Sequence, residues 1–357
     1  MPIGSATGPV RSKANTTLRI TDASDNSARW DRFVASDSRS TFCHQAGWKD
    51  IMSDVLGHEP RFLAAVDDAG EWRGVLPLVR VRSVLGHYLI SLPFLNDGGP
   101  LGEKRAQEAL VEHAVSEAKR SGAGLLELRS RNEVPGPVQS SDRRVAVHLN
   151  LPSSVEELWK ETFRAKLRSQ IRRPGKEGMV FLFGAGELDA FYKVLAHNMR
   201  DLGTPVLPRV FFERVEALFG SRLIFAVTYT KDGKPAAAAC CFLWRDELEV
   251  MWASSLRSLN HLSPNMLLYS GLMEEAIARR VRTFNFGRCS PGGATHRFKQ
   301  QWGGRDVPLP WPSWSRDGAT GVPSADRMMY RLAIGVWKHF PVAVANRLGP
   351  PLARLLP

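Results

Sequence analysis

The chain has 357 residues, of which 43% are hydrophobic and 24% are charged, a composition typical of a folded protein with more than one domain. Its formal net charge of +12 points to an anionic partner: a nucleic acid, a phosphorylated substrate or an acidic membrane face. The sequence shows no run of 18 apolar residues, no apolar leader segment and no metal-ligand spacing among its four cysteines. We therefore expect a cytoplasmic protein with no metal site.

Two segments of the chain have the same order of predicted elements. In the first, strands over 61–66, 75–81 and 88–92 precede a helix over 103–120 and a strand over 125–129. In the second, strands over 223–228, 235–243 and 248–252 precede a helix over 264–280 and a strand over 283–286. Val66 and Val227 are 161 positions apart, and Glu127 and Asn285 are 158 apart. This steady offset predicts a duplicated α+β unit with mixed central sheets.

The repeat divides the chain into four parts. We expect a disordered segment over 1–24, a first domain over 25–150, a second over 151–314 and an amphipathic tail over 315–357. From about residue 325 the tail carries basic and apolar residues at helical spacing. Such a helix could lie on a membrane surface or pack against the domain.

Between residues 164 and 176 the chain has six basic residues and no acidic one. Arg168, Arg172 and Lys176 lie four positions apart and would share one face of a helix. We expect Pro174 and Gly175 to end that helix and to leave Lys176 in a loop. The basic run is either a solvated face or a surface that binds phosphate or RNA.

A second candidate region precedes the helix predicted over 264–280. Ser263 is a plausible N-cap, and Pro264 suits the first helical position. The free N–H groups of a helix amino terminus can bind an anion or the oxygen of an acyl group. Arg257 and Asn265 lie nearby in the sequence and would add polar groups to such a site.

The stretch from Phe284 to Gly304 leaves a strand, crosses a glycine-rich loop and ends with cations and aromatics interleaved. Its counterpart after residue 129 lacks this pattern, so the second copy is the expected seat of chemistry. Arg200 and Asp201, at the end of another predicted helix, either pair with each other or bind substrate. The sequence contains no P-loop, no H-E-x-x-H and no G-x-S-x-G motif.

Several short runs carry a resemblance to a known family. They include Gly74-Val-Leu-Pro-Leu78, Gly98-Gly-Pro100, Asn198-Met-Arg-Asp-Leu-Gly-Thr-Pro205, Ser263-Pro-Asn-Met-Leu-Leu-Tyr269, Phe286-Gly-Arg288 and Arg297-Phe-Lys-Gln-Gln-Trp-Gly303. In these runs, from roughly Trp30 to Trp314, the chain resembles FemAB-type proteins of the branch associated with exosortase and exopolysaccharide genes. It departs from that branch at Cys289-Ser290 and at His296, which usually read Ser-Thr and Tyr.

The resemblance implies two tandem GNAT folds, that is, acyl-CoA N-acyltransferase-like domains. It also implies transfer of an acyl or aminoacyl group onto an amine of a cell-envelope, exopolysaccharide or peptidoglycan-type precursor. The donor would be aminoacyl-tRNA or acyl-CoA, with no tightly bound cofactor, and the acceptor an anionic or lipid-linked molecule. The chain lacks the pyrophosphate loop of ordinary acetyl-CoA enzymes and the long helical arm of some tRNA-dependent members.

We expect a cleft at the junction of the two copies. The candidate substrate-binding residues are Arg172, Lys176, Arg200, Trp252, Arg257, Asn265, Tyr269, Arg288, Lys299 and Trp302. Among them Arg288 and Lys299 would balance phosphate charge, and Trp252 and Trp302 would form walls. The candidate general bases are Asp201, Glu249 and His296, and a substrate phosphate could serve instead.

Three other classes of protein remain open. A non-catalytic tRNA- or nucleic-acid-binding protein would bind with a steep salt dependence and transfer no acyl group. A scaffold for polysaccharide assembly would keep the core without the chemistry. The third class is a membrane-associated protein, peripheral at the inner membrane, that acts through residues 325–357.

Overall fold

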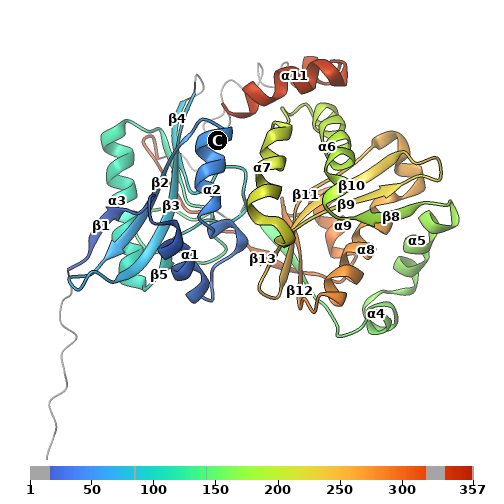
Figure 1. Cartoon of the computed structure of the whole chain (residues 1–357), viewed down its shortest axis with the longest axis horizontal. Helices are drawn as coiled ribbons and strands as arrows, with labels where there is room; N and C mark the ends of the chain where they lie inside the picture. Colours follow the sequence, from blue (N-terminus) through green and yellow to red (C-terminus); the bar gives the residue numbers. More distant parts are fainter. Residues whose placement is uncertain (1–16, 84–85, 142, 319–333, 356–357) are drawn as a thin grey trace, which may run out of the picture.

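The computed structural model describes residues 17–83, 86–141, 143–318 and 334–355. The chain forms two halves that lie side by side, each built on a mixed sheet with helices packed against it (Figure 1). This arrangement confirms the predicted α+β fold with duplicated units.

The first sheet has the strand order β1-β2-β3-β4-β6-β14, with β5 beside β3. Its pairs are antiparallel except for the parallel pair β4–β6, which helix α3 connects. The elements of this half are β1 (Arg19–Asp22), α1 (Ser27–Ser36), α2 (Gly47–Asp50), β2 (Glu59–Val66), β3 (Trp72–Ser83), β4 (Gly86–Ile90), β5 (Leu101–Gly102), α3 (Lys104–Ser121) and β6 (Leu125–Glu127).

The second sheet has the order β13-β7-β12-β11-β10-β9-β8, with β11–β12 as its parallel pair. Its elements are β7 (Val145–Asn150), α4 (Val155–Glu157), α5 (Ala165–Lys176), β8 (Val180–Phe183), α6 (Leu188–Leu202), α7 (Arg209–Phe219), β9 (Leu223–Tyr229), β10 (Pro235–Trp244), β11 (Glu247–Ser255), α8 (Pro264–Ala278), β12 (Thr283–Cys289), α9 (Ala294–Gln300) and β13 (Arg305–Pro308). Strand β14 (Ser313–Ser315) and helix α11 (Val342–Ala353) follow.

The repeat predicted from the sequence is present in both halves. The series β2, β3, β4, α3, β6 corresponds in order and pairing to β9, β10, β11, α8, β12. In both copies two antiparallel pairs lead into a helix, which returns the chain to a parallel last strand. Helix α3 buries Ala106, Leu110, Ala114 and Ala118, the face that its spacing predicts.

The chain passes between the two sheets more than once. Residues 145–150, which fall in the predicted first domain, form strand β7, and this strand pairs with β12 and β13 of the second sheet. Strand β14 returns to the first sheet and pairs with β6. The domain division at residue 150 therefore stays a prediction, and the two units are linked through both β7 and β14.

A single hydrophobic core joins the halves. Phe42, from the segment before α2, stacks on Phe242 of β10 with ring centroids 3.9 Å apart. Trp48 of α2 packs against Phe219 at the end of α7, at 5.0 Å. All four rings are buried, and the burial of these apolar surfaces stabilises both the contact between the halves and each half. This contact fixes the geometry of any site at the junction.

Three local predictions are wrong. Helix α5 continues through Pro174 to Lys176: Pro174 is buried there, although its ring removes the N–H that would donate to the carbonyl four residues earlier. Ser263 precedes α8 with φ of 58° and its side chain makes no capping bond, although Pro264 does begin the helix. Residues 1–16 of the segment predicted to be disordered lie outside the described residues, but Arg19–Asp22 form β1, where Ile20 packs on the cluster beneath α3.

Helix α11, in the C-terminal tail, packs on the second half. In α11 the small residues Ala345, Gly349 and Ala353 are buried at a spacing of four, and Gly349 lies against Val206. The helix lies across the ends of α6 and α7 (Figure 1). Residues 319–333 of the predicted tail lie outside the described residues. Of the helices that the structure describes, none has the length and apolar character needed to cross a bilayer.

Candidate functional site

The parallel strands β11 and β12 separate in the middle of the second sheet. Their pairing covers Glu247–Thr283, Leu248–Phe284 and Glu249–Asn285 and then stops. Strand β11 continues to Ser255 along β10, while β12 continues along β7. Beyond Glu249 no strand of the described chain pairs with this edge of β11, which leaves an opening in the hydrogen-bond ladder of the sheet. The carboxyl ends of parallel strands are where open α/β sheets bind ligands.

Gly287 holds the two strands together at the start of this opening. It has φ of 71°, and a Cβ built on it would lie 2.4 Å from the backbone oxygen of Val250. Only glycine fits such an approach without a shift of the backbone. The ladder between β12 and β7 is irregular between Asn285 and Arg288, and the Asn285 side chain accepts a bond from the Gly287 N–H. This irregularity sets the direction in which Arg288 leaves the strand.

Glu249 lies at the point where the strands separate. Its side chain is 4% exposed and accepts a hydrogen bond of 2.7 Å from Asn96 Nδ2 in the first half. Burial is the largest cause that raises the pKa of Glu249 to about 7. The nearby Glu247 and Asp97 also raise this pKa, whereas Arg131 and the bond from Asn96 lower it. A carboxyl group with this pKa can accept and release a proton near neutral pH.

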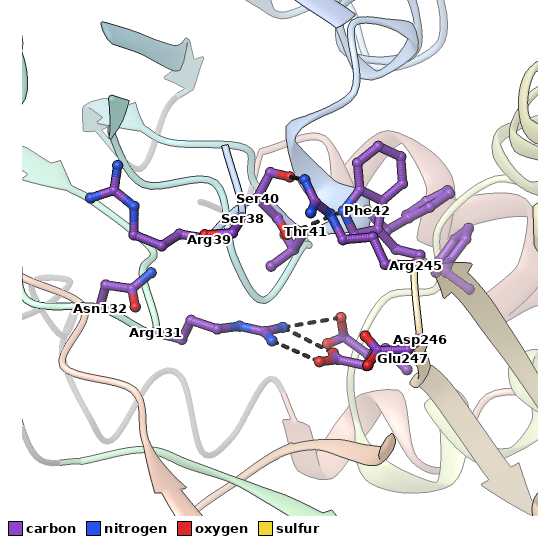
Figure 2. Close-up of a pocket in the computed structure, with 13 residues that line it drawn as sticks. Ser38, Arg39, Ser40, Thr41, Phe42, Arg131, Asn132, Arg245, Asp246 and Glu247 are labelled. Atoms are coloured by element: carbon purple, nitrogen blue, oxygen red, sulfur yellow. Dashed lines mark hydrogen bonds and ion pairs between the residues drawn. The ribbon is translucent and has the colours of Figure 1, made fainter. Parts of the chain in front are cut away.

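Arg131 crosses from the first half to the carboxylates of β11. Its guanidinium donates to both oxygens of Glu247, at 2.9 and 3.1 Å, and to Asp97 at 2.8 Å. It lies 3.9 Å from Glu249. Figure 2 shows this bridge beside a recess of about 150 Å³, whose walls include Arg39, Thr41, Phe42 and Arg245 as well as Glu247 and Glu249. Residues of both halves therefore form the recess next to Glu249.

Lys299 of α9 lies under the end of β12. Its ammonium donates to the backbone oxygens of Gly287 and Arg288, at 2.8 and 2.9 Å, and the residue is 4% exposed. Burial lowers the pKa of Lys299 to about 8. These contacts make Lys299 a residue that fixes the path of β12 beside the opening.

Polar side chains also gather at the far end of β11. Asn265, in the first turn of α8, donates to Ser255 Oγ at 3.0 Å, and Asn198 of α6 donates to Ser254 Oγ at 3.1 Å. Arg257 follows in an exposed turn. The amino end of α8 thus lies beside the unpaired edge of β11, as its position in the sequence predicts.

Arg172 and Lys176 lie elsewhere. Both are exposed on α5, which packs against α8 on the outer side of the second half, away from the junction (Figure 1). The Arg172 guanidinium lies over the ring of Trp159, 5.4 Å from its centroid. The structure does not bring these two cations together with Glu249.

Two of the candidate bases have other partners. Asp201 accepts a bond of 2.7 Å from Arg200, and Arg200 donates to the backbone oxygen of Phe340 in the tail. His296 is buried, with one ring nitrogen bonded to the Gly292 N–H and the other 2.8 Å from Asp306. Both ring nitrogens of His296 are therefore occupied, and Arg200 and Asp201 hold the tail against α6.

The aromatic candidates are mostly in the core. Trp302 is fully buried among Phe163, Phe286 and Phe298, so it does not form the wall of a recess. Trp252 is partly buried against the aromatic rings of α7. Tyr269 stacks on Phe286, and burial raises the pKa of its phenol.

The sequence did not single out Asn96, Arg131 or Glu247. Glu247 and Glu249 alternate along a strand, and Arg131 follows the last strand of the first copy, so the sequence does mark each of them as a charged residue near a strand end. The sequence does not show that these two segments meet in the fold. Within the described ranges no group of three histidines, cysteines or acidic residues is placed to hold a metal ion.

Comparison with known proteins supports the acyltransferase class that the sequence resemblance implies. Residues 161–300 match the acetyltransferase (GNAT) domain family. Comparison with curated protein sequences finds no match. Among solved structures the chain is similar to FemX, with 14% identity, a TM-score of 0.59 and coverage of 86% of this chain and 98% of that one.

Two further structures have the same fold. One is the C-terminal domain of a putative lysylphosphatidylglycerol synthetase from Agrobacterium fabrum, with 13% identity, a TM-score of 0.54 and coverage of 87% and 96%. The other is a tandem GNAT protein from the clavulanic acid biosynthesis pathway, with 12% identity, a TM-score of 0.52 and coverage of 84% and 97%.

The fold and the domain match define an enzyme of the GNAT acyltransferase class. Its fold is similar to that of FemX, and the acetyltransferase (GNAT) domain lies over residues 161–300.

Proposed function

We propose that this enzyme transfers an acyl or aminoacyl group onto the amine of a cell-envelope, exopolysaccharide or peptidoglycan-type precursor, with Glu249 as the general base. The observation that carries the proposal is the position of Glu249, a buried carboxyl with a pKa of about 7 at the point where β11 and β12 separate. Catalytic bases work best when their pKa lies near the operating pH.

The reaction forms a C–N bond and breaks the C–S bond of a thioester or the C–O bond of an aminoacyl ester. Glu249 takes a proton from the amine as nitrogen attacks the carbonyl carbon, and the proton then passes to the leaving thiol or hydroxyl. Backbone N–H groups on the unpaired edge of β11 and at the amino end of α8 would stabilise the developing oxyanion. Asn96 holds the carboxyl in place, and Arg131 anchors its neighbour Glu247.

Two donors fit the proposal. The name lysylphosphatidylglycerol synthetase denotes the formation of an aminoacylated lipid, which supports an aminoacyl donor and a lipid-linked acceptor. The tandem GNAT protein is described without AcCoA, which makes a CoA thioester the second donor. The exposed cations of α5, Arg172, Arg173 and Lys176, favour the first, because they offer a phosphate-binding surface for tRNA away from the chemistry.

We also propose that α11 contacts an anionic membrane surface. Val344, Leu348 and Leu352 recur at a spacing of four and are 40%, 45% and 40% exposed beside the packed face of the helix. Residues 334–355 contain Lys338, Arg347 and Arg354 and no acidic residue. An exposed apolar stripe next to cations is typical of helices that lie in the membrane interface.

The enzyme reading is tested with labelled aminoacyl-tRNA and acyl-CoA pools and amino-sugar or peptide acceptors. We expect transfer from one pool by the native chain and a loss of about 100-fold or more in Glu249→Gln. Salt-sensitive RNA binding with no transfer from either pool would favour the alternative, a non-catalytic nucleic-acid-binding or scaffold protein.

A further inference from the structure

Three arginines surround one indole at the junction of the halves. The guanidinium carbons of Arg129, Arg144 and Arg288 lie 4.8, 4.2 and 5.1 Å from the ring centroid of Trp311. Arg129 follows β6 and Arg288 lies in β12, so the last strand of each copy supplies one cation. Arg144 immediately precedes β7.

The indole is itself held in place. Its Nε1 donates to the backbone oxygen of Asn96 at 3.2 Å, and Trp311 has φ of 35°, which residues other than glycine rarely adopt. Asn96 also donates to Glu249, so one residue connects the three-arginine cluster with the proposed base.

Positive charge in this cluster exceeds negative charge. Glu127 lies 3.0 Å from Arg129 and 3.9 Å from Arg144. Within the described residues the guanidinium of Arg288 has no hydrogen-bond or ion-pair partner, and the residue is exposed to solvent. In the same described part of the chain Glu127 is the one carboxylate within 4 Å of these three guanidinium groups, so positive charge is in excess around Trp311.

The pKa values of two of these arginines shift in the direction that an excess of positive charge would cause. Desolvation by the surrounding protein and the neighbouring Arg129 and Arg144 lower the pKa of Arg288, although the residue keeps part of its surface in solvent. Burial, together with Arg129 and Arg143, likewise lowers the pKa of Arg144. Bringing an anion to these groups would relieve their mutual repulsion.

A recess of about 350 Å³ opens beside the cluster. Glu127, Arg143, Arg144 and Trp311 line it, together with the hydroxyl residues Ser141, Ser290 and Ser313. Its volume lies within the range of small-molecule sites, and its walls offer guanidinium and hydroxyl donors, which suit phosphate oxygens.

We infer that Arg144 and Arg288, held against Trp311, bind the phosphate or diphosphate group of a substrate. Arg129 lies buried behind them, where its guanidinium donates to Glu127 and to the backbone oxygens of Leu92 and Leu95. The inference rests on the proposed function only for the statement that the ligand is a substrate. The same chemistry could come from a CoA donor, from a soluble nucleotide-linked acceptor or from a lipid-linked diphosphate.

The test is isothermal titration of the full chain with inorganic pyrophosphate at low ionic strength. Arg144→Gln and Arg288→Gln, at solvent-accessible positions, should each weaken binding about tenfold, and the double variant should bind weaker still. Arg120→Gln, which removes an exposed cation of α3, is the matched control and should bind like the native chain. Circular dichroism verifies that each variant is folded.

Competition then identifies the source of the phosphate. Displacement of pyrophosphate by CoA indicates the donor, displacement by a nucleoside diphosphate sugar indicates a soluble acceptor, and displacement by geranyl diphosphate indicates a lipid-linked one. No pyrophosphate binding by the native chain, or equal binding by the folded double variant, would overturn the inference. Since no turnover is measured, pyrophosphate binding can succeed where acyl transfer fails, and the reverse.

Discussion

Replacing Glu249 with glutamine should stabilise the fold in a manner that depends on pH. Burial raises the pKa of this carboxyl from its ordinary value of 4.5 to about 7. The folded state therefore keeps the proton over a range in which the unfolded state has lost it. The contribution of Glu249 to stability falls as the pH rises from about 4.5 to about 7 and is then constant.

The size of the effect follows from the same two values. A pKa raised from 4.5 to about 7 corresponds to a cost of about 3 kcal/mol for the ionised form in the folded state. Glutamine has nearly the same shape, can accept the Asn96 bond and carries no charge at any pH. The free energy of unfolding of Glu249→Gln minus that of the native chain should therefore increase by up to about 3 kcal/mol as the pH rises from about 5 to about 8.

Glu247→Gln is the control from the same network. Burial alone would raise the pKa of Glu247, but Arg131 and the bonds from Arg131 and Asn285 outweigh it, so this pKa is lowered. Its stabilising contribution is present above about pH 4.5 and is lost only as the pH falls below that value. Glu247→Gln should destabilise the chain by a nearly constant amount over the same window.

Urea unfolding followed by circular dichroism at a series of pH values measures both differences. A difference between Glu249→Gln and the native chain that stays constant from about pH 5 to pH 8 would refute the reasoning, because Glu249 would then be ionised throughout.

Three further results are expected. Gly287→Ala should lower the free energy of unfolding by about 2 kcal/mol or more in thermal or urea melts. The control, Gly292→Ala, has a similar φ of 73° but nothing within 4 Å of the added Cβ, so it should lower the free energy of unfolding by less. Equal losses would mean that the contact with Val250 does not matter. Arg172→Ala combined with Lys176→Ala should weaken tRNA binding and reduce its salt slope by about 2 in filter-binding assays, and an unchanged slope would exclude α5 as the tRNA surface. Leu348→Glu should abolish co-sedimentation with vesicles of anionic phospholipid, while Leu182→Glu on the exposed edge strand β8 should not; retention by Leu348→Glu would rule out α11 as the contact.

The repeated unit could be predicted because its signals are local. Alternation and turn residues mark β2, β3, β9 and β10, and the spacing of Ala106, Leu110 and Ala114 marks α3. Helix α7 was missed, although Phe211, Val215 and Phe219 recur every four residues and are buried. Strand β7 was missed because its pairing with β12 and β13 depends on segments more than 130 residues later.

The site could be predicted only in part, because its residues meet through the packing of the two halves. Glu249, Arg288 and Lys299 are candidates that their own segments indicate. Asn96 and Arg131 reach Glu249 and Glu247 from the other copy, at separations of 153 and 116 residues. Trp302 was predicted to be a wall from a motif of cations and aromatics, but it lies in the turn after α9 and is buried inside the core. A single sequence does not indicate which aromatic residue faces a ligand.

The central claim is acyl transfer with Glu249 as the base, and the most direct test is the pH dependence of kcat/KM for the native chain and Glu249→Gln with the donor that supports transfer. The account predicts that the native rate rises with pH to a plateau, with an apparent pKa of about 7, because Glu249 must be ionised to accept the proton. It predicts for Glu249→Gln a loss of about 100-fold or more and no such rise. A glutamine variant that is as active as the native chain, with the same pH profile, would contradict it.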